Sequence, residues 1–212
     1  MSRHFDAIII GAGQAGPSLA GRLTGAGMTV ALVERKLFGD TCVNTGCMPT
    51  KTLVASAYAA HVARRGADYG VDAPLRSDMA RVKARADAVS ANARAGVEAR
   101  LRGMKGCTVI EGGARFVAPD TIGVGEERLS APRIIINVGG RAVVPDLPGI
   151  DRILYLTNTS MLKLDRVPVV GQSEIRKASP HGRAFRPGGC ASSPATGAHL
   201  LTTAIRIFER VQ

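Results

Sequence analysis

Gly11-Ala12-Gly13-Gln14-Ala15-Gly16 decides the fold, because this GxGxxG motif lies between a short apolar run and a helical pattern. Residues 5–10 predict a buried strand, residues 15–26 a helix and residues 29–34 a second, β-branched strand. Strand, glycine turn, helix and strand make one right-handed βαβ unit. The sequence therefore predicts an α/β, Rossmann-like fold.

Each glycine of this motif has a distinct role in dinucleotide-binding folds. Gly11 permits the tight turn, Gly13 lets a pyrophosphate approach the backbone, and Gly16 lets the helix pack close to the strand. The helix N-terminus then faces the phosphates. The whole loop is thus a candidate cofactor site, including Ala12, Gln14 and Ala15.

Glu34 ends the second predicted strand, 23 residues after Gly11. An acid at this position can accept hydrogen bonds from ribose hydroxyls, and its charge disfavours the 2′-phosphate of NADP. The motif alone could also be an ordinary turn, but its context favours dinucleotide binding. It does not decide between FAD and NAD.

A second stretch favours redox chemistry: Gly39-Asp40-Thr41-Cys42-Val43-Asn44-Thr45-Gly46-Cys47-Met48-Pro49-Thr50-Lys51. Five residues of regular helix rise ~7.5 Å, whereas a disulfide requires Cα atoms closer than ~7 Å. Turn-forming residues 44–46 could fold the chain back so that the cysteines meet. Cys47 would then lie at the start of a helix over 47–63, where the helix dipole favours a thiolate. Lys51 lies four residues on, on the same helical face.

Two other interpretations of the cysteines are open: two unrelated buried residues, or half of a zinc site. Zinc usually takes four nitrogen or sulfur ligands in a recognisable spacing, and Cys107, Cys190 and the four histidines offer no second pair. The redox interpretation is favoured. Cys107 and Cys190 are interpreted as structural or incidental.

The remaining elements follow from periodicity and turn residues. Residues 35–46 predict a loop, and residues 78–104 predict a helix that Ser77 caps. Four strands are predicted over 107–111, 114–117, 122–124 and 133–138, as a small antiparallel meander that returns to a core strand. Aromatic residues make up 4% of the chain and Trp is absent, so the core should be aliphatic.

Charge and composition restrict the partners. The net charge is +11, and residues 166–212 hold seven Lys and Arg against two Asp and Glu. This excess could attract nucleic acid, but no nucleic-acid motif accompanies it, so a solvated basic surface is favoured. No apolar stretch approaches the ~20 residues that span a bilayer, and no signal peptide is recognised. We therefore expect a cytoplasmic protein without membrane contact.

A change in composition and periodicity divides the chain into residues 1–168 and residues 169–212. Glycine, proline, serine and arginine mingle after residue 168, and residues 177–194 show no period, which predicts loop or disorder. Residues 198–211 predict a helix. The fold expected is thus an incomplete α/β unit with an irregular C-terminal tail.

The cysteine stretch resembles the pyridine nucleotide-disulfide oxidoreductases, the group of dihydrolipoamide dehydrogenase, glutathione reductase and mercuric reductase, and looks most like the mercuric reductase branch. Two further stretches are similar to the family: residues 111–116, and residues 134–141 followed by Pro145 and Pro148-Gly149. The similarity covers about residues 4–168. It places FAD contacts on the glycine loop and on Glu34, Arg35, Thr41, Gly46, Lys51, Ala114, Val138 and Gly139.

The resemblance implies a specific electron path. NAD(P)H reduces FAD, and the flavin passes electrons to the disulfide through Cys47. Cys42 is the interchange thiol that attacks a small-molecule or disulfide substrate, and Lys51 lies near flavin N5.

The chain departs from the family pattern at its second nucleotide loop. In residues 169–176, Gln172 and Arg176 stand where the family has glycines, which opposes NAD(P)H binding. The family's dimerisation domain, with its acid/base His–Glu pair, has no counterpart in the sequence. We therefore expect a truncated enzyme with little activity alone, or alternatively a non-catalytic FAD-binding module or degenerate remnant.

Overall fold

The computed structural model describes residues 2–72 and 74–166. Three predicted features lie outside the described residues: the altered glycine loop at 169–176, the irregular stretch at 177–194 and the helix at 198–211. The domain boundary after residue 168 stays a prediction.

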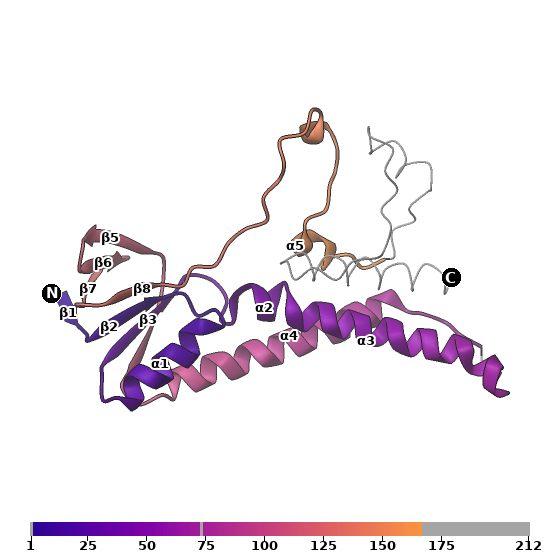
Figure 1. Cartoon of the computed structure of the whole chain (residues 1–212), viewed down its shortest axis with the longest axis horizontal. Coiled ribbons are helices and arrows are strands. Elements are labelled where there is room, and N and C mark those ends of the chain that lie inside the picture. The colour runs from indigo at the N-terminus through magenta and orange to yellow at the C-terminus, as the bar shows by residue number, and fades with distance from the viewer. Residues whose placement is uncertain (1, 73, 167–212) are drawn as a thin grey trace, which may run out of the picture.

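A parallel sheet forms the centre of the fold, with the strand order β4-β3-β2-β8 (Figure 1). Its strands are β2 (Ala7–Ile10), β3 (Val30–Glu34), β4 (Cys107–Glu111) and β8 (Ile134–Ile136). Ala7 faces Val30 across β2 and β3, and Ile8 faces Ile134 across β2 and β8. Helix α1 (Ala15–Gly25) connects β2 to β3, which confirms the predicted βαβ unit.

A second sheet carries the predicted meander. Its order is β1-β7-β6-β5, with β1 at Ser2–His4, β5 at Ala114–Ala118, β6 at Thr121–Val124 and β7 at Glu127–Ser130. Strands β5, β6 and β7 pair antiparallel, and the chain then returns to the parallel sheet as β8. Strand β7 was not predicted, because only Leu129 of its four residues is buried.

The predicted strand over residues 5–10 is present but begins two residues later, at Ala7. The chain leaves the second sheet after β1 and enters the parallel sheet at β2. Asp6 marks the break, since its carboxylate accepts hydrogen bonds from the backbone N–H (2.7 Å) and the hydroxyl (2.8 Å) of Thr29. These bonds lower the pKa of Asp6. A polar residue with this local partner therefore separates the two strands.

Two long helices pack side by side and extend away from the sheets (Figure 1). They are α3 (Cys47–Arg64), followed by a 3-10 turn η1 (Arg65–Tyr69), and α4 (Met79–Arg102). Arg85 on α4 donates hydrogen bonds to the carbonyl of Thr52 (3.0 Å) and the hydroxyl of Ser56 (3.1 Å) on α3. These bonds tie the two helices together.

The predicted cap of this second helix is off by one residue. The N-cap of α4 is Asp78, not Ser77, and its carboxylate accepts a hydrogen bond from the backbone N–H of Arg81 at 3.1 Å. Both residue types cap well, so the choice between neighbours depends on where the backbone turns. The helix ends at Arg102, two residues before the predicted end.

The core is aliphatic, as predicted. One cluster includes Ile8, Val33 and Leu129 and joins the two sheets, whereas a second includes Ile9, Leu32 and Leu101 and joins the parallel sheet to α1 and α4.

The segment after β8 contains the 3-10 turn η2 (Ile150–Arg152) and the short helix α5 (Asn158–Met161). In the described part of the chain, no helix is both long and apolar enough to cross a membrane.

Candidate active site

All four strands of the parallel sheet end at one edge, and the predicted cofactor residues gather there. Strand β2 leads into Gly11, β3 ends at Glu34, β4 leads into Gly112 and β8 leads into Asn137. Ligands of open parallel sheets bind outside the carboxyl ends of the strands. This edge is therefore the candidate cofactor site.

Gly11 is held between β2, β3 and β8. The backbone N–H of Gly11 donates to the carbonyl of Val33 (2.8 Å). The side-chain amide of Asn137 donates to the carbonyl of Gly11 (3.2 Å). Its φ is +109°, and a Cβ on Gly11 would lie 2.1 Å from the carbonyl oxygen of Asn137. Only glycine fits this position, both for conformation and for space.

Gly16 is also restricted by backbone, as predicted from close packing of helix and strand. A Cβ at Gly16 would lie 2.5 Å from the carbonyl oxygen of Gly11. The first turn of α1 therefore approaches the end of β2 more closely than any side chain would allow.

Glu34 is buried at the end of β3 and uses both carboxylate oxygens. Oε2 accepts a hydrogen bond from the backbone N–H of Ala12 (2.8 Å), and Oε1 accepts one from that of Lys36 (2.9 Å). The carbonyl of Glu34 accepts a third from the backbone N–H of Gly112 (2.9 Å). Glu34 thus fixes the glycine loop to β3 and keeps further lone pairs for a ligand.

The prediction of a loop over residues 35–46 is wrong in its second half. A single helical turn, α2, covers Asp40–Asn44 and contains Cys42. It begins after Gly39, whose φ of +85° reverses the chain, and the backbone N–H of Val43 donates to the carbonyl of Gly39. Five residues with one glycine before them give too weak a periodicity for helix prediction.

The two cysteines face each other across the α2–α3 junction. Cys42 is half-buried in α2, and Cys47 is exposed as the first residue of α3, as the sequence predicted. Cys47 lies close enough to Cys42 for its side chain and its backbone N–H to act on the pKa of the Cys42 thiol. The two cysteines are therefore neighbours across this junction.

Gly46 makes this approach possible. A Cβ on Gly46 would lie 2.7 Å from the carbonyl oxygen of Thr41 and 3.2 Å from Cα of Cys42. We expect Gly46→Ala to push α2 from α3 and to lower the Cys42–Cys47 disulfide equilibrium constant roughly tenfold, because disulfide geometry tolerates little displacement. Titration with glutathione buffers, with alkylated cysteines counted by mass spectrometry, measures this constant.

Gly96→Ala is the matched control for that substitution, since a Cβ on Gly96 in α4 meets nothing within 4 Å. It should leave the disulfide equilibrium unchanged. Equal constants for Gly46→Ala and the unsubstituted chain would contradict the role of Gly46.

Burial raises the pKa of Cys42, and the hydrogen bond with the Cys47 side chain raises it further. The charge of Lys51 acts in the opposite direction. Because the raised pKa keeps the thiol protonated, alkylation of Cys42 should be slow at neutral pH. Its rate should still rise with pH after that of an unstructured cysteine peptide has levelled off.

Two variants test the causes of this shift, with alkylation of the Cys42 peptide followed by mass spectrometry. Cys47→Ala should move the pH profile to lower pH, since it removes the side-chain hydrogen bond. Lys51→Gln should move it to higher pH. A profile of Cys42 that coincides with that of the peptide would contradict the assignment.

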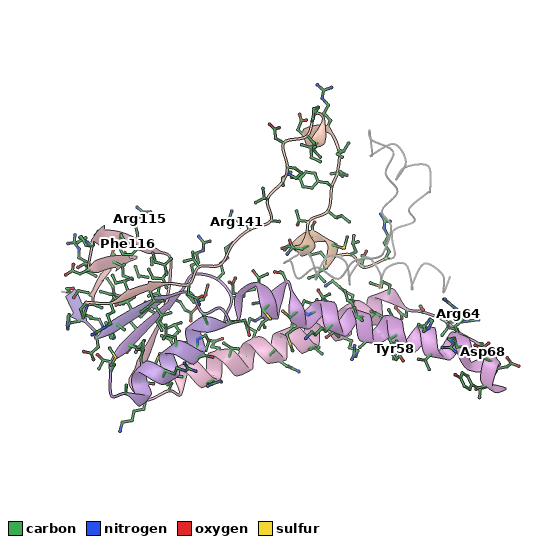
Figure 2. All side chains as sticks on the ribbon, in the orientation of Figure 1. Tyr58, Arg64, Asp68, Arg115, Phe116 and Arg141 are labelled. Carbon is green, nitrogen blue, oxygen red and sulfur yellow. The ribbon has the colours of Figure 1, made fainter. Side chains whose placement is uncertain are left out.

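The other predicted site residues differ in exposure, and two of them lie outside the parallel sheet and its loops: Ala114 begins β5 and Lys51 lies in α3. The half-buried ones are Gly46 and Ala114, and the exposed ones are Gln14, Ala15, Arg35, Thr41, Lys51, Val138 and Gly139. Gly139 lies near the glycine loop, because the side chain of Asp40 lies next to both Gly13 and Gly139. Figure 2 shows Arg141 further along the segment that follows β8, and Arg115 and Phe116 on the second sheet.

Three residues that position the site were not predicted from the sequence. Asn137 reaches Gly11, as described above. Asn44 donates hydrogen bonds to the carbonyls of Phe38 and Asp40, both at 2.9 Å, and accepts one from Arg94 on α4 at 3.2 Å. Asn44 and Arg94 are fifty residues apart in sequence, so no local pattern could have paired them.

Comparison with known proteins agrees with this geometry. The sequence profile of the pyridine nucleotide-disulphide oxidoreductases matches residues 5–175. The chain belongs to this family. Members of the pyridine nucleotide-disulphide oxidoreductase family are flavoproteins, and the predicted family resemblance is confirmed.

Two curated relatives within the family carry different names. Mercuric reductase of Bacillus cereus is 33% identical over 176 residues, which cover 81% of this chain and 28% of the relative. Dihydrolipoyl dehydrogenase of Acholeplasma laidlawii is 30% identical over 174 residues, which cover 79% of this chain and 52% of the relative. The chain thus spans about a quarter to a half of the length of these relatives.

A solved structure shares the fold. The HOCl-induced flavoprotein disulfide reductase RclA from Escherichia coli superposes with a TM-score of 0.63 at 33% identity. The match covers 77% of this chain and 35% of RclA. The predicted α/β, Rossmann-like class of the pyridine nucleotide-disulphide oxidoreductases is therefore confirmed.

Proposed function

We propose that this chain is the FAD-binding part of a flavin-dependent disulfide reductase. In the full reaction, an electron pair passes from NAD(P)H to the Cys42–Cys47 disulfide and then to a small-molecule or disulfide substrate. One observation carries the proposal: the glycine loop and Glu34 lie at the carboxyl edge of one parallel sheet, and Asp40, at the start of the helix that holds Cys42, lies beside Gly13 and Gly139 at this edge.

The residues at this edge fit most of an FAD molecule. Gly11 and Gly16 pack backbone against backbone, which holds the start of α1 close to the end of β2, where the N-terminus of a dinucleotide-binding helix faces phosphate. Glu34 suits a ribose diol at the end of β3. Asp40 is the exception, because its carboxylate lies beside Gly13. The proposed contacts are the glycine loop 11–16 with Glu34, Arg35, Thr41, Gly46, Lys51, Ala114, Val138 and Gly139.

FAD, when bound, would supply hydride acceptance from NAD(P)H and delivery of the electron pair to the disulfide. The cysteines then reduce the substrate. The thiolate of Cys42 attacks a substrate disulfide and releases one thiolate, and the thiolate of Cys47 attacks Cys42 and releases the second. Two protons convert these products to thiols, and the Cys42–Cys47 disulfide forms again.

The state of Cys42 sets a requirement for this chemistry. Because its pKa is raised, a base must remove its proton before attack at neutral pH. The described residues place Lys51 near Cys42, and Lys51 stabilises the thiolate but is itself an acid. We therefore infer that the chain alone turns over slowly, which the altered glycine positions Gln172 and Arg176 also favour.

Binding of FAD to Glu34→Gln tests the proposed cofactor site. The side-chain NH2 of glutamine would replace one of the two oxygens of Glu34 and would face a backbone N–H group, so one hydrogen bond would be lost. Loss of this bond should destabilise the site by about 1–3 kcal/mol. We expect the variant to bind FAD at least tenfold more weakly in a flavin fluorescence titration. Glu127→Gln is the matched control, since Glu127 pairs with Arg3 on the second sheet.

Three outcomes of this titration are distinct. Weaker binding by Glu34→Gln alone supports the site, and equal binding by both variants contradicts it. Binding of FAD whose dithionite-reduced form leaves the Cys42–Cys47 disulfide intact would favour a non-catalytic FAD-binding module over a reductase.

A further inference from the structure

A carboxylate lies in the space that a dinucleotide pyrophosphate should approach. A Cβ on Gly13, the middle glycine of the loop, would lie 3.2 Å from Oδ2 of Asp40, and a Cβ on Gly139 would lie 2.6 Å from the same atom. Oδ2 of Asp40 therefore sits between two glycines that have no side chain to shield it. The middle glycine of GxGxxG is the point of close pyrophosphate approach.

The backbone holds Asp40 in this place. It is the one non-glycine residue with positive φ (+49°) among the residues that the structure describes. The side chain of Asn44 donates to the carbonyl of Asp40, and Arg94 in turn orients Asn44. Short polar residues tolerate this conformation at a modest cost, so the position of the carboxylate is fixed by α2 and α4.

The charge of Asp40 has little compensation. None of the ion pairs formed within residues 2–72 and 74–166 includes it. Its carboxylate accepts one long hydrogen bond, from the hydroxyl of Thr41 at 3.5 Å. Glu34 differs, since two backbone N–H groups satisfy its oxygens. Of the two carboxylates at this edge, that of Asp40 therefore has fewer hydrogen-bond donors to offset its charge.

We propose that Asp40 is a specificity-determining residue that weakens binding of diphosphate-containing ligands at the glycine loop. This inference rests on the proposed function, because it concerns the same cofactor site. Like charges brought together with little screening repel each other strongly. The diphosphate of FAD or ADP should therefore add less to the affinity than it does at a loop without this carboxylate. We expect the chain to bind FAD weakly.

Three ligands separate the charge effect from the rest of the site: FAD, ADP and adenosine, titrated calorimetrically at low and high salt. Asp40→Asn removes the charge and keeps the size and the tolerance of positive φ. Asp40→Gly removes the side chain as well. Asp68→Asn is the control, because Asp68 lies at the far end of the α3 region (Figure 2) and pairs with Arg65.

We expect Asp40→Asn and Asp40→Gly to bind FAD and ADP about tenfold more tightly than the unsubstituted chain at low salt. Adenosine affinity should not change. High salt should reduce the difference in FAD and ADP affinity between the Asp40 variants and the unsubstituted chain, since it screens the repulsion. Asp68→Asn should behave as the unsubstituted chain.

Two results would overturn the inference. Equal FAD and ADP affinities in the Asp40 variants and the unsubstituted chain would refute it, while adenosine binding would leave the proposed function intact. Absence of binding of all three ligands to every variant would refute the proposed function and this inference together.

Discussion

Gly11→Ala is expected to destabilise the chain by about 3–5 kcal/mol, more than any other single methyl addition at the site. The new Cβ would lie 2.1 Å from the carbonyl oxygen of Asn137 and would meet backbone, which cannot rotate away. Strain from the φ of +109° adds to this collision. Urea unfolding followed by circular dichroism measures the loss.

Gly27→Ala isolates the collision from the strain. Gly27 also has positive φ (+82°), but a Cβ there meets nothing within 4 Å. We expect a cost of about 1–2 kcal/mol from conformation alone. If both variants lose the same stability, Gly11 is not restricted by the approach of β8, and the account of the glycine loop is wrong.

The second large effect concerns the cysteines, where single substitutions should eliminate disulfide formation. After mild oxidation of the folded chain, the unsubstituted protein should lose two titratable thiols. Cys42→Ser and Cys47→Ser should lose none within the same time, because each removes one partner of the pair. The expected change is thus all or none.

Cys107→Ser provides the comparison for this thiol count. Cys107 lies on β4, and burial raises its pKa, so it should oxidise slowly and its variant should still lose two thiols. Loss of two thiols in Cys42→Ser would show that another pair reacts, and would contradict the assignment of Cys42 and Cys47.

The parts of the fold that sequence predicts well are those that depend on local pattern. The βαβ unit follows from two β-branched runs around a glycine loop, and Cys47 starts a helix because turn residues precede an Ala-rich stretch. These features need neighbours only a few residues away. The family resemblance rests on the same short stretches.

The parts that sequence does not predict depend on contacts between distant residues. Asp6, between β1 and β2, is held by Thr29, and Asn44 is held by Arg94. The carboxylate of Asp40 lies between Gly13 and Gly139, and Gly139 follows β8, which pairs with β2 across more than a hundred residues of sequence. Such contacts carry no periodic signal, and residue type alone does not identify them.

Reductive titration of the FAD-loaded chain tests the central claim, that the cysteine pair is the redox partner of a flavin held at the glycine loop. Dithionite is added without oxygen to the oxidised chain, and flavin absorbance is followed. We expect uptake of two electron pairs per FAD by the unsubstituted chain and one by Cys42→Ser. Uptake of one pair by both, with FAD bound, would contradict it.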